Sequence, residues 1–218
     1  MSLRRKANDE SINLVAAIAD SENTKASLVF VTRKGTVKQT KMDSYFASAQ
    51  NSTAIKLIND DTLVDVIKVD TEKDRVLIYT KRGNCILFSA KDVTLTSRST
   101  VGVNGIRLED GDEVIGACAV RHNDNYIITI SDRGEFKKVS LETSLTSMRR
   151  GDYGVSIMAR SEELNTIVAT NDKVEKLIAV ISGEYQEVDI SGLQVKTRVS
   201  NGEKLTNALR GNRVVIVQ

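Results

Sequence analysis

Short runs of apolar and β-branched residues alternate with polar turns along the chain, and four stretches share one pattern. In each, a strand-like run meets a glycine-bearing polar turn and continues in a second run with an apolar residue two positions after the glycine. The four stretches are "LVFVTRKGTVKQT" (28–40), "VLIYTKRGNCILF" (76–88), "IITISDRGEFKKV" (127–139) and "KLIAVISGEYQEV" (176–188). A turn of this kind between two such runs is typical of a β-hairpin, so the pattern predicts four hairpins.

The hairpins recur at a nearly constant spacing. Their glycines, Gly35, Gly83, Gly134 and Gly183, lie 48, 51 and 49 residues apart. A polar or acidic turn leads into a further strand-like run in step with them, at 59–69, 109–120, 160–170 and 209–217, and one more copy stands at 8–19. Polar segments that contain Gly or Ser connect each hairpin to that run, at 48–58, 96–108, 147–159 and 195–209. The chain therefore consists of repeats of several short strands, without a long amphipathic helix.

The repeat predicts an all-β, propeller-like fold. Periods of about 40–50 residues with about four strands per unit are typical of β-propellers, in which each unit buries its apolar faces against its neighbours. We expect one domain over residues 8–218, with units of approximately 8–69, 70–120, 121–170 and 171–218, and a linker or expression remnant at 1–7. Two stacked antiparallel sandwiches are the alternative, which the single shared period disfavours.

Charge is balanced in total but not along the chain. The 31 Lys and Arg residues exceed the 29 Asp and Glu residues by only two. Residues 26–41 nevertheless carry four cations and no acid, whereas 161–191 carry seven acids and two lysines. The repeats differ in the same way, because the residue before the hairpin glycine is Lys34, Arg82 and Arg133 in the first three and Ser182 in the fourth. Equivalent positions of a propeller lie around one edge or face, so these cations predict a curved basic path.

A curved basic path suits bent duplex DNA, because Lys and Arg neutralise phosphates and release condensed counterions. Such contacts to phosphate carry little sequence preference. The predicted DNA-binding residues are Arg33, Lys34, Lys38, Lys41, Lys81, Arg82, Arg98, Arg133, Lys137, Lys138, Arg149 and Arg150. The alternative for each one alone is a cation that protects a strand edge or keeps the surface soluble.

The sequence predicts no catalytic centre, metal site or cofactor. The one histidine, His122, lies in a polar turn-like stretch, and the acidic turns lack the spacing of a calcium loop. Cys85 and Cys118 lie far apart, in no metal-binding spacing, which suits a reducing compartment. No apolar run approaches the roughly 18 residues that a membrane span needs, so we expect a cytoplasmic location.

These repeats resemble the C-terminal β-pinwheel domain of bacterial type IIA topoisomerase A subunits, meaning the A subunits of DNA gyrase and of topoisomerase IV. The stretches that carry the resemblance are "LVFVTRKGTVKQT", "INDDTLVDVIKV" and "VTLTSRSTVGVNGIRLEDGDEVIGA", and "VDISGLQVKTRVSNGEKL" in the last unit. The resemblance implies a non-catalytic disc that binds and bends duplex DNA on a basic outer edge, in the nucleoid. It implies two further partners, the ATPase B subunit and the remainder of the A subunit. The full-length protein would be an ATP-dependent topoisomerase whose catalytic tyrosine lies outside this chain.

Gyrase members of this family carry a seven-residue box, Q-R-R-G-G-K-G. The nearest match here is "MRRGDYG", Met148 to Gly154, which keeps both arginines and the outer glycines. It has Met148, Asp152 and Tyr153 in place of Gln, Gly and Lys, and it lies in the third unit. This departure favours the topoisomerase IV type over a gyrase wrapping domain. Two rival hypotheses are a propeller that binds proteins through the acidic segment 161–191 and an enzymatic propeller with a central site.

Overall fold

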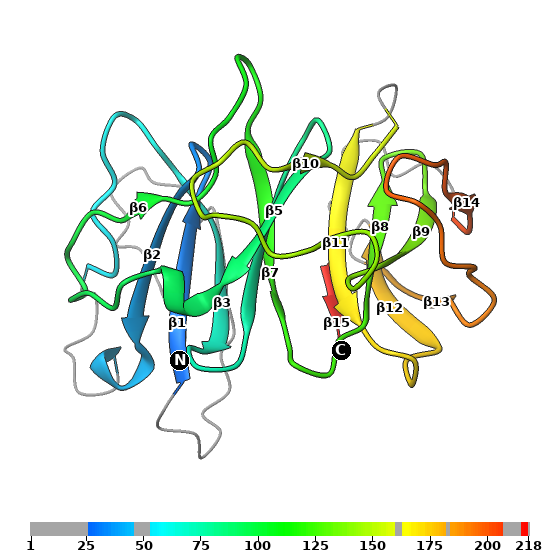
Figure 1. The fold of residues 1–218 in the computed structure, drawn as a ribbon, viewed down its shortest axis with the longest axis horizontal. Coiled ribbons are helices and arrows are strands. Elements are labelled where there is room, and N and C mark those ends of the chain that lie inside the picture. Colours follow the sequence, from blue (N-terminus) through cyan, green and yellow to red (C-terminus); the bar gives the residue numbers. More distant parts are fainter. Residues whose placement is uncertain (1–25, 46–52, 160–162, 182–183, 207–214, 218) are drawn as a thin grey trace.

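A computed structural model describes residues 26–45, 53–159, 163–181, 184–206 and 215–217. These residues form fifteen β-strands in four antiparallel sheets, which follow one another across the molecule in chain order (Figure 1). Two short 3₁₀ turns, at Met42–Tyr45 and Ala90–Asp92, are the other regular elements of these ranges. The expected remnant at 1–7, the expected strand at 8–19 and the tip of the fourth hairpin at 182–183 lie outside the described residues.

Each sheet is built around one predicted hairpin and the strand that follows it. The hairpins are β1 (Ala26–Thr32) with β2 (Thr36–Lys41), β4 (Arg75–Thr80) with β5 (Asn84–Ser89), β8 (Tyr126–Ser131) with β9 (Glu135–Ser140), and β12 (Lys176–Ile181) with β13 (Glu184–Asp189). The following strands are β3 (Leu63–Asp70), β7 (Val114–Val120), β11 (Leu164–Thr170) and β15 (Val215–Val217), each paired with the first strand of its hairpin. The predicted all-β repeat architecture is confirmed.

The outermost strand of each of the first three sheets comes from the next repeat. β6 (Val103–Asn104) pairs with β2, β10 (Val155–Ser156) pairs with β5, and β14 (Glu203–Lys204) pairs with β9. The sheet orders are therefore β3-β1-β2-β6, β10-β5-β4-β7 and β11-β8-β9-β14, followed by β13-β12-β15 (Figure 1). The repeats found in the sequence thus do not coincide with the sheets, because the second, third and fourth repeats each contribute strands to two of them.

Glycine permits this exchange of strands. Gly102, Gly154 and Gly202 each precede the exchanged strand, and a Cβ atom added there would lie 2.2, 2.3 and 2.9 Å from the carbonyl oxygens of Val37, Cys85 and Phe136. Only a residue without a side chain lets the two backbones approach so closely.

The exchanged strands also bury the apolar residue that follows each hairpin turn. Val37, Cys85 and Phe136 lie directly opposite these strands and are at most 1% exposed. Tyr185 stands at the equivalent place on β13, and its side chain is 78% exposed.

The cores lie between successive sheets. Val29 and Val31 of β1 pack with Val76 and Ile78 of β4, and equivalent clusters join the second sheet to the third and the third to the fourth. The strands β3, β7 and β11 contact one another in turn and form the inner edges of the first three sheets. The exchanged strands β6, β10 and β14 consequently lie at the opposite, outer edges.

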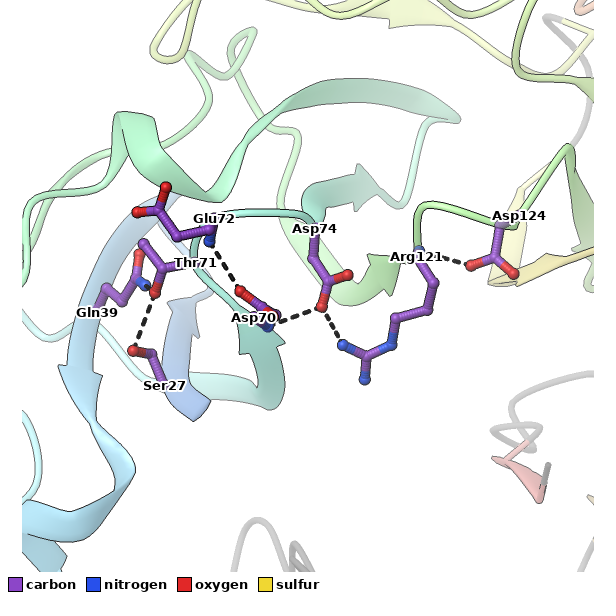
Figure 2. Close-up of polar contacts among 8 residues, drawn as sticks. All are labelled: Ser27, Gln39, Asp70, Thr71, Glu72, Asp74, Arg121 and Asp124. Carbon is purple, nitrogen blue, oxygen red and sulfur yellow. Dashed lines mark hydrogen bonds and ion pairs between the residues drawn. The ribbon is translucent and has the colours of Figure 1, made fainter. Parts of the chain in front are cut away.

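Turns at the end opposite the hairpin tips couple neighbouring repeats. Asp74, which is 4% exposed, accepts a hydrogen bond from the Asp70 backbone N–H at 2.8 Å and pairs with the Arg121 guanidinium (Figure 2). In the next repeat Asn125 donates to the Asp172 carboxylate at 3.3 Å. Each turn therefore makes a side-chain contact with the turn that follows it.

The strand exchange can be tested at a crossing glycine. Gly102→Ala would place a Cβ against the Val37 carbonyl, and overpacking of this kind costs about 2–3 kcal/mol. For a chain of this size that loss lowers Tm by about 4–12 °C, which thermal denaturation by circular dichroism measures. Gly192→Ala is the matched control, because no atom lies within 4 Å of its added Cβ. Equal Tm values for the two variants would contradict the close approach.

Candidate nucleic-acid interface

The hairpin tips carry the predicted cations, but acidic turns stand beside them. The Lys34 backbone N–H donates to the Asp61 carboxylate at 2.9 Å, and the Arg82 N–H donates to Asp112 at 3.2 Å. The Arg82 guanidinium also donates to the Asp110 carbonyl at 3.0 Å. These turns lead into β3 and β7, so the acids come from the part of each repeat that follows the hairpin.

Ion pairs involve the tips as well. Arg33 lies 3.8 Å from Glu113 of the next repeat, and Lys81 lies 3.9 Å from Glu163. The described tips at 33–34, 81–82 and 132–133 and the turns at 59–62, 109–113 and 163 together hold five cations and eight acids. The tips therefore do not form the basic arc that the sequence predicts. Phosphate binding by Arg33, Lys34, Lys81, Arg82 and Arg133 stays a prediction that this local charge disfavours.

Two predicted DNA-binding residues are wrong, because Lys38 and Lys137 are buried. Their side chains are 1% and 2% exposed. The Lys137 ammonium donates to the carbonyls of Ile157 at 2.7 Å, Ser200 at 2.9 Å and Arg198. It therefore fastens the segment that carries β14 to the end of the third repeat, and no phosphate can reach it.

Lys38 has a similar setting in the first sheet. Its ammonium donates to the Thr40 hydroxyl at 2.5 Å and to the Ala54 carbonyl at 3.0 Å, and it lies 5.3 Å from the centre of the Phe30 ring. Burial disfavours the charged form and lowers the pKa of Lys38 to about 8. The ammonium contributes to packing within the sheet and not to surface charge.

The two other cations predicted on β2 and β9 are Lys41 and Lys138. Lys41 is exposed, whereas Lys138 contacts side chains of its own sheet and of the next turn. Lys41 ends β2 with its side chain in solvent. The Lys138 ammonium lies 4.1 Å from the centre of the Tyr126 ring and 3.9 Å from Asp172, and its side chain is 18% exposed. Lys138 is therefore mostly covered by its own sheet.

The outer edge has a different character. Three segments carry the exchanged strands, residues 93–108, 145–158 and 193–206, and we call them the rim segments. Each contains an arginine four positions before its crossing glycine: Arg98, Arg150 and Arg198. Arg98 and Arg150 belong to the predicted set, whereas Arg198 is an addition that the shared spacing R-x-x-x-G identifies.

Hydrogen bonds join each rim segment to the next. Arg150 donates to the carbonyls of Asp92, at 2.8 Å, and Asn104, and Arg198 donates to the Ser156 carbonyl at 3.1 Å. Asn104 and Ser156 hold equivalent positions on β6 and β10. Arg150 and Arg198 therefore link successive outer strands into one continuous surface.

The rim segments are basic and partly apolar. Together they hold seven cations and two acids. The cations are Arg98, Arg107, Arg149, Arg150, Lys196, Arg198 and Lys204. Their exposed large apolar side chains are Leu95, Val101, Val103, Tyr153, Val195, Val199 and Leu205. The excess of positive charge lies here, and Arg98, Arg149 and Arg150 of the predicted set lie within it.

Two kinds of reactive group can be checked in the described residues, a thiolate and a metal-ligand cluster. Burial raises the pKa of the Cys85 thiol to about 12, so the thiolate nucleophile is suppressed. The described residues contain no group of three His, Cys, Asp or Glu side chains that could hold a metal ion. None of their helices is long and apolar enough to cross a membrane.

Comparison with known families decides the assignment. The family model of the DNA gyrase C-terminal domain, a β-propeller, matches residues 26–70, 74–119 and 125–182. The chain belongs to this family. It is 30% identical over 196 residues to the DNA gyrase A protein of Helicobacter pylori strain J99, covering 88% of this chain and 23% of that protein. The gyrase C-terminal domain family thus accounts for the repeats, and the chain spans about a quarter of this relative's length.

Solved structures of the family share the fold. A C-terminal domain of DNA topoisomerase IV matches with a TM-score of 0.78 at 24% identity, over 92% of this chain and 64% of that one. A C-terminal domain of DNA gyrase A matches with a TM-score of 0.76 at 19% identity, over 90% and 68%. The β-pinwheel architecture of the gyrase C-terminal domain family is therefore that of this chain.

Removal of the charge should change the free energy of unfolding by different amounts at the two buried lysines. Lys137→Met leaves three backbone carbonyls without this donor, and we expect a loss of about 3 kcal/mol in the free energy of unfolding. Lys38→Met should change it by less than about 1 kcal/mol, because Tyr45 also donates to the Ala54 carbonyl. Urea denaturation of both variants measures the difference, and a larger loss for Lys38→Met would refute this ranking.

Burial of Lys38 also predicts a pH dependence. Its pKa is about 8 in the folded chain against 10.5 for the free side chain, so between these values the unfolded chain binds more protons. Stability of the wild type relative to Lys38→Met should therefore rise by up to about 3 kcal/mol from pH 8 to pH 10.5 and stay constant below pH 7. Urea denaturation across this range checks the slope, and a flat difference would mean that Lys38 has an ordinary pKa.

Proposed function

We propose that this chain is a non-catalytic module that binds and bends duplex DNA along its rim segments. The observation that supports it is the continuous rim, in which seven cations from three repeats lie on hydrogen-bonded, neighbouring segments. Lys and Arg along a curved edge neutralise successive phosphates, and bent DNA keeps them in contact. Family membership supports the same proposal, since the relatives are subunits of a topoisomerase.

The proposed contacts follow from exposure and partners. Arg149 and Lys204 are exposed, whereas Arg150 and Arg198 also hold backbone carbonyls. Arg98 and Arg107 complete the rim set together with Lys196, whose ammonium also lies 3.1 Å from Glu203. Lys41 stays a peripheral contact. Because these groups face phosphates and not base edges, binding should depend little on sequence.

Family membership also supports a proposal for the larger protein to which this chain belongs. We infer that the chain is part of the A subunit of an ATP-dependent type II topoisomerase, which works with a B subunit at the nucleoid. The rim would select DNA segments for a catalytic tyrosine outside this chain. The "MRRGDYG" stretch, with Asp152 and Tyr153 where the gyrase box has Gly and Lys, favours a topoisomerase IV type over a gyrase wrapping domain.

Salt dependence of duplex binding tests the proposal. For about 6–10 phosphate contacts, affinity should fall roughly 10³–10⁵-fold between 50 and 200 mM salt, measured by fluorescence anisotropy of a labelled duplex. Arg149→Gln and Lys204→Gln should each reduce the slope of log K against log salt by about 0.9.

The matched controls are Arg33→Gln and Lys81→Gln, which remove the same charge from the hairpin tips beside Glu113 and Glu163. They should leave the slope unchanged. Equal effects of tip and rim variants would move the interface to the tips. Absence of duplex binding at low salt, together with a tight protein partner, would replace the proposal with a protein-binding propeller.

A further inference from the structure

Tyr153 is the large aromatic residue of the rim segments, and its side chain is 53% exposed. It lies directly before the crossing glycine Gly154, at the place that Val101 and Asn201 hold in the other rim segments. Its ring does not belong to a hydrophobic core cluster. Packing within the described chain therefore does not account for a tyrosine here.

The loop that presents Tyr153 is fixed on both sides. The Gly151 N–H donates to the Gly105 carbonyl at 2.9 Å, and the Asp152 carbonyl accepts from the Arg107 N–H at 2.9 Å. Gly154 is held against the Cys85 carbonyl, where no side chain fits. The ring is consequently held out from a rigid loop, so little conformational entropy is lost when a partner covers it.

One cation lies against the ring, and two more belong to the same rim segment. The Arg107 guanidinium lies 5.3 Å from its centre, in the range of a cation–π contact. Arg149 is exposed four residues before it, and Arg150 is anchored to the backbone of the first rim segment. An exposed aromatic ring among cations suits a polyanion that also offers apolar surface, which duplex DNA does through its sugars and base edges.

We propose that Tyr153 is a wedge for duplex DNA, an inference that rests on the proposed function. Its ring enters the minor groove where the duplex crosses the middle rim segment, while Arg107 and Arg149 bind flanking phosphates. Apolar side chains inserted in this way partly unstack a base step and kink the duplex. The wedge concentrates the bend at the second sheet and supplies an interaction independent of charge.

The test uses the 218-residue chain with Tyr153→Ala, Tyr153→Phe and the control Tyr185→Ala. Tyr185 is also exposed, on β13 beside Glu184 and Glu187. Its replacement by alanine therefore removes an exposed ring of the same kind from acidic instead of basic surroundings. Tyr153→Ala should bind a duplex at least about five-fold more weakly and bend it less, as seen by energy transfer between end labels. Its salt slope should equal that of the wild type, because no charge is removed. Tyr153→Phe and Tyr185→Ala should behave as the wild type.

A tryptophan probe gives an independent readout, since the chain contains no Trp. Fluorescence of Tyr153→Trp should be quenched on duplex binding, and that of Tyr185→Trp should not. If the wild type binds the duplex and Tyr153→Ala binds and bends it equally well, the wedge is refuted and the proposed function stands. An affinity loss without a change in bend also refutes it. If the wild type does not bind duplex DNA at all, both proposals fall together.

Discussion

The close approach of two backbones at the crossing glycines is the constraint on which the rest of the structure depends. Gly102 and Gly154 let one repeat lay its outer strand over the hairpin of the repeat before it. That strand buries an apolar residue which would otherwise face solvent, as Tyr185 does on the fourth sheet. Neighbouring repeats are therefore coupled through shared sheets as well as through the cores between them, and the sheets of the first three repeats are each completed by the repeat that follows.

The same exchange builds the candidate interface. Because the outer strand of each sheet belongs to the following repeat, the rim segments reach across from one sheet to the preceding one. Arg150 and Arg198 have two roles in the rim segments. Their hydrogen bonds fix the outer strands, and their positive charge adds to that of the surface. A rim that is rigid and basic can impose its own curvature on a duplex, since the protein does not have to reorganise when the polyanion binds.

The sequence was sufficient to predict the hairpins and the strands that follow them. It was not sufficient to predict which side chains surround the candidate cations. Regular glycine spacing and apolar alternation predicted the hairpins and the strands after them, because these signals are local. The sequence did not reveal that Asp61 and Asp112 accept hydrogen bonds from the backbone of the hairpin tips, or that neighbouring segments cover Lys38 and Lys137. These contacts join residues far apart in the chain. The R-x-x-x-G spacing before the exchanged strands was a local signal as well, and alignment on these glycines would have found Arg198.

The fourth sheet limits where a duplex can run. In the ranges 172–181 and 184–191 it carries five acids and two lysines, and Lys176 is bound to Glu187 at 2.6 Å. The side chains of β13 other than Val188 are exposed. Phosphates approaching this sheet meet carboxylates in solvent, whereas phosphates at the first three sheets meet the rim cations. The near-neutral net charge of +2 therefore hides a basic rim and an acidic fourth sheet, and we expect a bound duplex to follow the outer edges of the first three sheets and turn away before the fourth.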